Sequence, residues 1–111
     1  MTGEYERGHV VRGPDLFGPH RHRPFVRLSD DSHPFEAEEA LLAAVTSTPR
    51  PRAIRLRDGD FVCGSLPRES YVNPWTVATV KHADLAGVEG RLTSRITDRI
   101  AEATAGYLGV P

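Results

Sequence analysis

Residues 40–45 form a continuous apolar run, Ala-Leu-Leu-Ala-Ala-Val, and this run constrains the fold more than any other stretch. Amino-acid propensity alone would make it helical, but it is short for a helix and ends directly at Thr46-Ser47-Thr48-Pro49. Short apolar runs bounded by turn-forming residues are typical of strands buried on both faces. The sequence therefore predicts a central buried strand at 40–45.

Several other short segments have the composition of strands. Residues 53–57 alternate, with Ile54 and Leu56 on one face and arginines on the other. Pro24 is expected to start the apolar strand that follows it, because proline cannot donate to a ladder from the middle of a strand. Asp58-Gly59 predicts a hairpin turn. Further strands are expected at 9–12, 61–62 and 76–80.

One strong helix pattern lies near the C-terminal end. Thr93 is a suitable N-cap residue and Gly109 a suitable stop. Between them, apolar side chains recur at spacings of three and four residues, at Ile96, Ile100, Ala103, Tyr107 and Leu108. Short strands followed by one terminal helix predict a mainly β fold, which is a small barrel or strongly bent sheet with a helix packed on it.

The length of 111 residues fits one domain, which we expect at 7–111 after a polar leader at 1–6. No apolar run approaches the ~20 residues of a membrane span, and the charged N-terminal segment lacks a signal-peptide core. A cytoplasmic location is therefore expected. Cys63 is the only cysteine, which excludes an intrachain disulfide, and we expect it to be partly buried.

Charge is unevenly distributed along a chain whose net charge is only −1. The densest cationic stretch is His20-Arg21-His22-Arg23, in a turn directly before an apolar strand. Arginine can stabilise a phosphate that gains charge during transfer, and histidine can move protons near neutral pH. Composition alone nevertheless favours a simpler interpretation, a solvated basic turn. A hydroxyl at the end of a buried strand, such as that of Thr46, could hydrogen-bond a phosphate or simply end the strand.

Other kinds of site have less support from the residues. His20 and His22 have a spacing that occurs in zinc sites, but no cysteine or carboxylate completes a recognised ligand pattern. No G-x-S-x-G elbow supports a Ser-His-Asp triad, and the Walker and dinucleotide-binding glycine patterns are absent. We therefore expect neither a metal nor a cofactor.

Several segments, in order, resemble the PemK/MazF toxin family. They are Arg7-Gly8-His9-Val10-Val11, the strand from Arg23-Pro24 to Ser29-Asp30, the strand ending Ala44-Val45-Thr46-Ser47, the stretch from Ser70-Tyr71-Val72-Asn73 to Thr76-Val77, and Gly90-Arg91-Leu92-Thr93 before the helix. The resemblance implies an SH3-like small β-barrel, PemK/MazF/CcdB-like, with a C-terminal helix, and it implies a homodimer.

The resemblance also implies a function. PemK/MazF toxins are metal-independent endoribonucleases of toxin–antitoxin pairs, and they cut single-stranded RNA by attack of a 2′-hydroxyl on the adjacent phosphate. The family's catalytic arginine, before proline, falls on Arg23, and its catalytic threonine falls on Thr46. Single-stranded RNA and a cognate antitoxin are therefore the expected partners. The residues expected to contact RNA are Phe17, His20, Arg21, His22, Ser47 and Thr48.

The sequence departs from the family pattern at three places. His9 stands where an R-G-D opening is common, Arg27 stands where an aliphatic residue is usual, and 15–18 replaces a Glu/Gln-containing loop segment. Two of these departures concern the substrate loop, so a second hypothesis stays open. It is a barrel that has lost catalysis and binds RNA or a protein segment in a regulatory role. Interaction with DNA or gyrase, which occurs among structural relatives of this barrel, has no residue support here.

Overall fold

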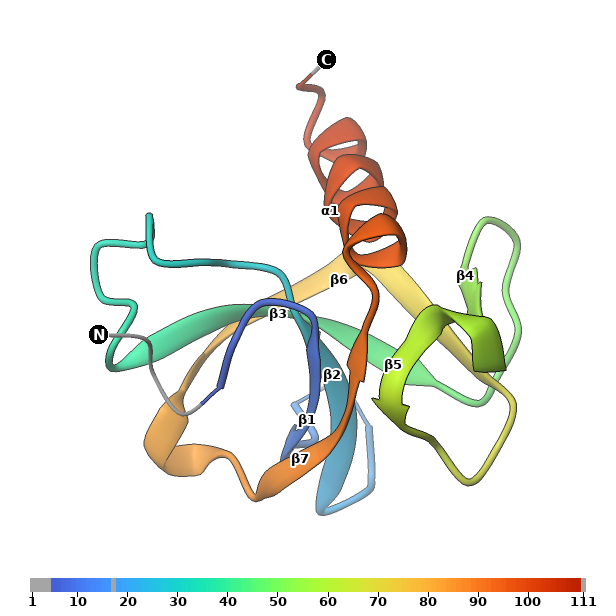
Figure 1. Cartoon of the computed structure of the whole chain (residues 1–111), viewed down its shortest axis with the longest axis horizontal. Coiled ribbons are helices and arrows are strands. Elements are labelled where there is room, and N and C mark those ends of the chain that lie inside the picture. Colours follow the sequence, from blue (N-terminus) through green and yellow to red (C-terminus); the bar gives the residue numbers. More distant parts are fainter. Residues whose placement is uncertain (1–4, 17, 111) are drawn as a thin grey trace.

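The computed structural model describes residues 5–16 and 18–110, which form a curled antiparallel sheet and one α-helix (Figure 1). The strands are β1 (His9–Pro14), β2 (His22–Arg27), β3 (Glu39–Thr46), β4 (Ile54–Leu56), β5 (Phe61–Gly64), β6 (Ser70–Lys81) and β7 (Gly87–Leu92). The helices are η1 (Asp58–Asp60), η2 (His82–Asp84) and α1 (Ser94–Tyr107), of which the first two are short 3₁₀ helices. Among the described residues, no helix combines the length and apolar character needed to cross a bilayer.

The strands lie in the order β4-β6-β3-β2-β1-β7-β5 within a single sheet. The two end strands, β4 and β5, lie on the same side of the molecule but do not pair with each other (Figure 1). The sheet is therefore an incomplete barrel that is open between β4 and β5.

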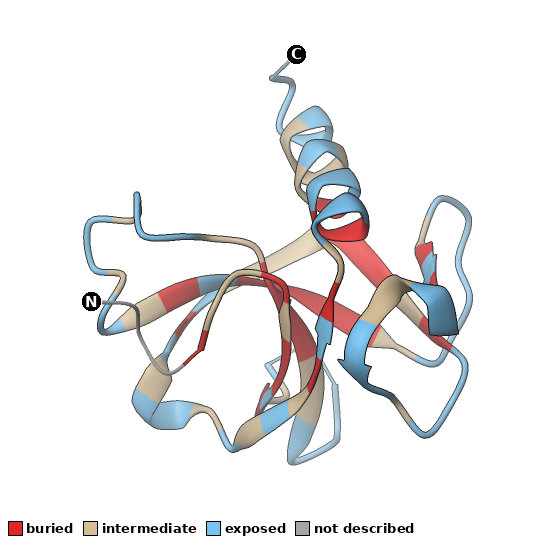
Figure 2. Ribbon diagram, viewed as in Figure 1, coloured by how far each residue is buried: buried red, intermediate tan, exposed pale blue. Residues whose placement is uncertain are grey.

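The central strand β3 is buried on both faces from Leu42 to Val45, as its apolar run predicted, while Leu41 within the run is 38 % exposed (Figure 2). On one face, Ala43 and Val45 pack in a core with residues of β1, β2 and α1. On the other face, Leu42 and Ala44 pack in a second core with Phe25 and with Tyr5. Burial on both faces explains why this strand carries no polar alternation.

The longest strand, β6, bends where proline interrupts its pairing with β3. Ala43 faces Val77 while Ala44 faces Asn73, so the residues between Asn73 and Val77 bulge from the ladder. Proline has no N–H to donate, which makes a bulge the expected place for Pro74. The Pro74 carbonyl accepts a hydrogen bond of 2.7 Å from Thr104 Oγ1. The bend in β6 is therefore also where α1 is anchored.

Helix α1 begins at its predicted N-cap and stops at Gly109 as predicted, in the left-handed conformation (φ +81°), but the end of its apolar stripe is exposed. The Thr93 side chain accepts a hydrogen bond of 3.4 Å from the backbone N–H of Ile96, which is the expected N-cap. At the other end, Tyr107 and Leu108 are 46 % and 76 % exposed. The apolar stripe therefore extends beyond the core, and Tyr107 instead meets the Trp75 ring edge-on, with 5.5 Å between centroids.

Three local predictions were wrong. Asp58-Gly59 forms part of η1 rather than a hairpin turn, and the flanking strands pair with β6 and β7. Pro24 is third in β2 rather than first. It is tolerated because pairing with β3 begins only at Phe25, so β2 has one neighbour at that point. Cys63 is exposed rather than partly buried.

Strand β7 was not predicted from the sequence, in which the stretch from Gly90 was expected to open the helix. The sequence of this strand contains two glycines and a glutamate, residue types with low strand propensity, so its composition did not predict a strand. Gly90 is required because β5 passes close by: a Cβ at this position would lie 2.8 Å from the carbonyl oxygen of Cys63. Close backbone approach, rather than a turn, therefore explains this glycine.

Candidate active site

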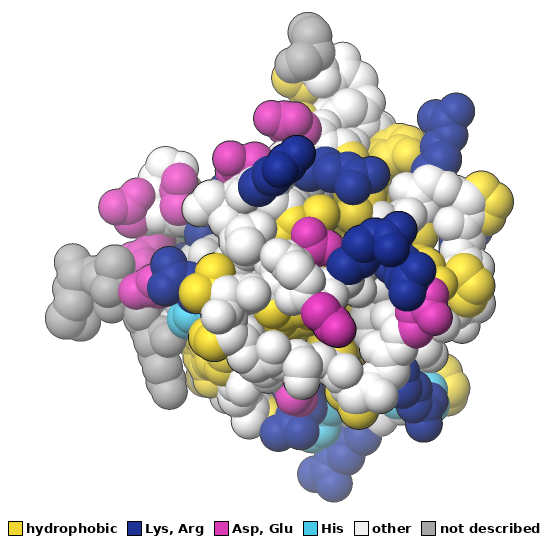
Figure 3. Space-filling view, turned by 45° about the vertical axis from the view of Figure 1, so that its right-hand side comes forward, with side chains coloured by type: hydrophobic (Ala, Val, Ile, Leu, Met, Phe, Trp, Pro, Cys, Tyr) yellow, Lys and Arg dark blue, Asp and Glu magenta, His cyan; other side chains and the backbone are white. Residues whose placement is uncertain are grey.

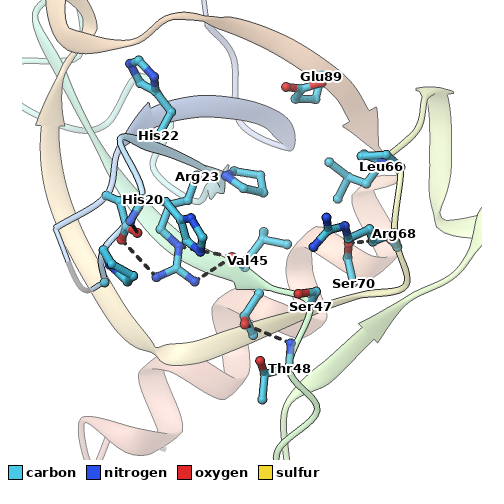
Figure 4. A pocket seen from close by; sticks show the side chains of 16 residues that line it. His20, His22, Arg23, Val45, Ser47, Thr48, Leu66, Arg68, Ser70 and Glu89 are labelled. Atoms are coloured by element: carbon cyan, nitrogen blue, oxygen red, sulfur yellow. Dashed lines mark hydrogen bonds and ion pairs between the residues drawn. The ribbon is translucent and has the colours of Figure 1, made fainter.

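A groove of about 420 Å³ lies where the β1–β2 loop meets the end of β3 (Figure 4). The start of β2 and the end of β3 form one wall, and the β5–β6 loop, the start of β6 and one residue of β7 form the other. The apolar strands β2 and β3 are fixed by the core, so the polar residues at their ends occupy defined positions. The groove contains both residues that the sequence singled out for chemistry, Arg23 and Thr46.

Arg23 is held by two acceptors that leave part of its guanidinium free. Its Nε and Nη2 atoms donate to the carbonyl oxygen of Val45 at 3.3 and 2.9 Å. Its Nη1 atom donates to Asp15 Oδ1 at 3.4 Å. A guanidinium has five N–H donors, so these bonds leave two for a ligand. The side chain is 18 % exposed, which keeps it largely desolvated yet open to the groove.

Asp15 is the residue that orients Arg23. Its side chain is only 1 % exposed, and its other oxygen accepts the backbone N–H of His20 at 3.0 Å. The carboxylate thus links the guanidinium to the loop that carries the histidines. This role was not predicted from the sequence, because an aspartate between prolines and glycines is equally typical of a turn. Its spacing from Arg23 along the chain carries no recognisable pattern.

Thr46 closes β3 and shapes the chain that follows. Its Oγ1 atom accepts the backbone N–H of Thr48 at 3.1 Å, which bends the chain directly after the strand. Ser47 and Thr48 are exposed and line the groove with Thr46. Three consecutive hydroxyls therefore lie at the mouth of the groove beside the carbonyl that holds Arg23.

Solved structures show the same chain path. An endoribonuclease from a mycobacterial species, solved in complex with its cognate antitoxin, has a TM-score of 0.73 at 22% identity, covering 96% of this chain and 95% of that chain. The MazE–MazF complex of Deinococcus radiodurans has a TM-score of 0.71 at 14% identity, covering 96% of this chain and 97% of that chain. The chain has the MazF fold. Mycobacterium tuberculosis toxin MazF-mt6 is also similar, with a TM-score of 0.68 at 18% identity over 93% and 96% of the chains. No family model and no curated protein matches the sequence.

The MazF-like fold confirms the predicted small barrel with a C-terminal helix, although the barrel is open between β4 and β5. It brings together most of the residues predicted to contact RNA. His20 and His22 line the groove with Arg23, as do the hydroxyls after β3. Arg21 is exposed and does not line the groove. Phe17 lies outside the described residues.

The wall opposite Arg23 was not predicted from the sequence. It includes Leu66, Arg68, Ser70 and Glu89, which come from distant parts of the chain (Figure 4). Ser70 Oγ donates to the carbonyl oxygen of Arg68 at 2.8 Å and so fixes the end of the β5–β6 loop. No local motif marks these residues, because only the folding of the MazF-like sheet brings them to Arg23.

The charges of the groove are mixed. Arg23 and Arg68 supply cations, while Asp15 and Glu89 supply carboxylates. Glu89 is paired with Arg12 at 3.5 Å, outside the groove lining. Within the described part of the chain, no three His, Cys, Asp or Glu side chains gather in a way that could hold a metal ion.

Proposed function

We propose that this protein is an endoribonuclease that cleaves single-stranded RNA by attack of a 2′-hydroxyl on the adjacent phosphate, without a metal. The observation that carries the proposal is Arg23, which keeps two N–H donors for a ligand and lines a groove that also contains Thr46. Pre-oriented donors in a partly desolvated site stabilise charge that develops during phosphoryl transfer. The similarity to solved endoribonucleases of the same fold supports the reaction class.

In the proposed reaction, the 2′-oxygen forms a bond to phosphorus and the bond from phosphorus to the 5′-oxygen breaks. The products are a 2′,3′-cyclic phosphate and a 5′-hydroxyl. Arg23 stabilises the extra negative charge on the phosphate, and Thr46 hydrogen-bonds a phosphate oxygen. A guanidinium is a poor base, so we assign the proton leaving the 2′-hydroxyl and the proton reaching the 5′-oxygen to His20 and His22, which line the same groove.

We also propose that the protein works as a homodimer and is controlled by an antitoxin. Solved structures of this fold include an endoribonuclease with its cognate antitoxin and a MazE–MazF complex. An apolar groove of about 550 Å³ between α1 and β6 supports a protein interface, and its lining includes Trp75, Tyr107 and the exposed Leu108. Light scattering should give twice the chain mass of 12.2 kDa if the dimer forms.

The direct test is incubation of the purified protein with single-stranded RNA in the presence of EDTA. We expect fragments whose 5′-hydroxyl ends accept phosphate from polynucleotide kinase without prior phosphatase treatment. Intact RNA under all conditions would reject the nuclease. If the protein binds this RNA without cutting it, the result supports the alternative function, a protein that only binds RNA in the same groove.

A further inference from the structure

A second groove opens beside the candidate active site. It has a volume of about 400 Å³ and is formed by β4, η1, the start of β5 and the β5–β6 loop. This places it over the opening of the barrel, where the two end strands of the sheet do not pair. The two grooves share the lining residues Leu66, Pro67, Arg68 and Ser70. One depression in the surface therefore continues into the other.

Arginines line this second groove in a regular row. Arg55 lies in β4 between the buried Ile54 and Leu56, and Arg57 follows the strand in extended conformation, so both side chains are exposed on the groove side. Alternate residues of a strand are about 6.6 Å apart on the same face. Arg68 belongs to both grooves and marks the passage between them. Figure 3 turns the β4–β5 side forward, and Lys and Arg side chains form several groups on that face.

The arginines of the second groove are available to an anion. Arg57 and Arg68 make no ion pair among the described residues, and Arg55 pairs with Glu69 at 3.2 Å. That pair is about half exposed, at 45 % and 54 %, and exposed pairs are weak enough to rearrange around a phosphate. The groove also contains Asp58, so three arginines face two carboxylates. The groove therefore has only a small excess of positive charge. Such a groove favours a polyanion, which can make several contacts, rather than a single small anion.

We infer that single-stranded RNA continues from the active-site groove past Arg68 into the second groove, where Arg55 and Arg57 bind its phosphates. The inference rests on the proposed function, because the ligand is the same RNA strand. Phe61, which is partly buried against the core, also lines the second groove and offers the exposed part of its ring to a base. Grooves that combine arginines with an aromatic side chain are typical of binding to single strands without strict sequence preference.

The experiment measures binding of 2′-O-methyl RNA, which lacks the attacking hydroxyl, by fluorescence anisotropy over a series of salt concentrations. An RNA of about 4 nucleotides fills the active-site groove only, while one of about 12 reaches the second groove. The test variant is Arg55→Ala with Arg57→Ala. The matched control is Arg95→Ala with Arg99→Ala, which removes the same charge from the exposed face of α1.

For the longer RNA, we expect the test variant to lower the slope of log affinity against log salt by about 1.4, with roughly tenfold weaker binding at moderate salt. The short RNA should bind the test variant as it binds wild type, and the control variant should keep the wild-type slope for both lengths. A wild-type slope for the longer RNA on the test variant would overturn the inference.

Cleavage of unmodified RNA by the wild-type protein is measured in parallel. If the slope changes as expected but no RNA is cut, the proposed nuclease function fails and the second binding groove stands. If RNA is cut but the test and control variants have equal slopes, the nuclease stands and the second groove fails. The two claims are therefore judged by different readouts.

Discussion

The carboxylate of Asp15 lies 3.4 Å from Nη1 of Arg23, with only 1 % of the Asp15 side chain exposed. The same side chain accepts the backbone N–H of His20 at 3.0 Å. One residue of the β1–β2 loop thus orients the proposed catalytic cation and fixes the loop that carries a histidine. Its negative charge also lies beside the proposed phosphate position, so it opposes RNA binding while it orients Arg23.

Asp15→Asn separates these two effects, because asparagine keeps the size of the side chain and an acceptor for His20. We expect kcat on RNA to fall about tenfold or more, since Arg23 loses a charge-assisted bond and its orientation. KM should fall or stay unchanged, because a charge that repels phosphate has been removed. Steady-state kinetics on a fluorogenic RNA measures both. A higher KM with unchanged kcat would contradict the positioning role of Asp15.

Thr46→Val tests the hydroxyl at the end of β3 without changing the shape of the side chain. A hydrogen bond to a charged group is worth about 1.5–3 kcal/mol, so we expect kcat/KM to fall by roughly ten- to a hundredfold. Thr46→Ser keeps the hydroxyl that accepts the Thr48 N–H and should retain most activity. Single-turnover cleavage compares the two variants. Equal cleavage rates for Thr46→Val and Thr46→Ser would show that the Thr46 hydroxyl takes no part in the reaction.

Local sequence patterns predicted the parts of the fold that short-range chemistry decides. The apolar run before Thr46 and the N-cap at Thr93 each depend on residues within one element. The apolar run also places Thr46 at the end of β3, next to the start of β2 that carries Arg23. Strand β7 was not predicted because Gly90, which weakens its strand character, is required by the close approach of β5, and only the folded sheet reveals that approach.

The opposite wall of the groove could not be predicted for a related reason. Arg68 and Glu89 line the groove opposite Arg23 and come from the β5–β6 loop and from β7, far along the chain. The contact between Asp15 and Arg23 depends on the path of a loop rich in glycine and proline. Such contacts follow from long-range topology, so residue types near Arg23 gave no sign of them.

Arg27 is a buried cation whose hydrogen bonding is incomplete. Its side chain is 1 % exposed, Nε donates to the carbonyl of Ser29 at 3.0 Å, and Nη2 lies 3.7 Å from Glu36. Its Nη1 atom has no hydrogen-bond partner among the described residues. The sequence showed only that an arginine stands where the PemK/MazF family, which the sequence resembles, usually has an aliphatic residue. Because desolvation of a buried ion pair offsets much of its Coulomb attraction, we expect this charge to add little to the stability of the fold.

Replacing Arg27 and replacing Glu36 should therefore have opposite effects on stability. Arg27→Leu removes the buried charge and keeps apolar volume, so we expect no loss, or a gain of about 1–2 kcal/mol, in the free energy of unfolding. Glu36→Ala leaves the cation buried without its partner and should cost about 3 kcal/mol. Urea unfolding measures both. A loss of several kcal/mol in Arg27→Leu would show that the ion pair is net stabilising.

His9 gives the fold a dependence on pH. Burial lowers the pKa of His9, reinforced by Arg91 and Arg27 and opposed by Glu6. Its Nδ1 accepts the backbone N–H of Glu6 at 2.9 Å, which requires that nitrogen to be unprotonated. Because the unfolded chain binds this proton more readily, the free energy of unfolding should decrease as pH falls below 6.5.

His9→Asn is the matched variant, since its side-chain oxygen can accept the same N–H without titrating in this range. Urea midpoints measured from neutral to mildly acidic pH should decline less steeply in His9→Asn than in wild type. Parallel pH profiles for the two proteins would assign the acid sensitivity to other groups.

The claim that Arg23 makes this groove cleave RNA is tested most directly by one comparison. Wild type, Arg23→Ala and Arg95→Ala are incubated with single-stranded RNA in EDTA, after circular dichroism has shown that all three are folded. Wild type and Arg95→Ala, which removes a charge from the exposed face of α1, should cut the RNA to 5′-hydroxyl fragments at equal rates. Arg23→Ala should be about a hundredfold slower or worse. Intact RNA with wild type, or cleavage by Arg23→Ala at the wild-type rate, would contradict the account.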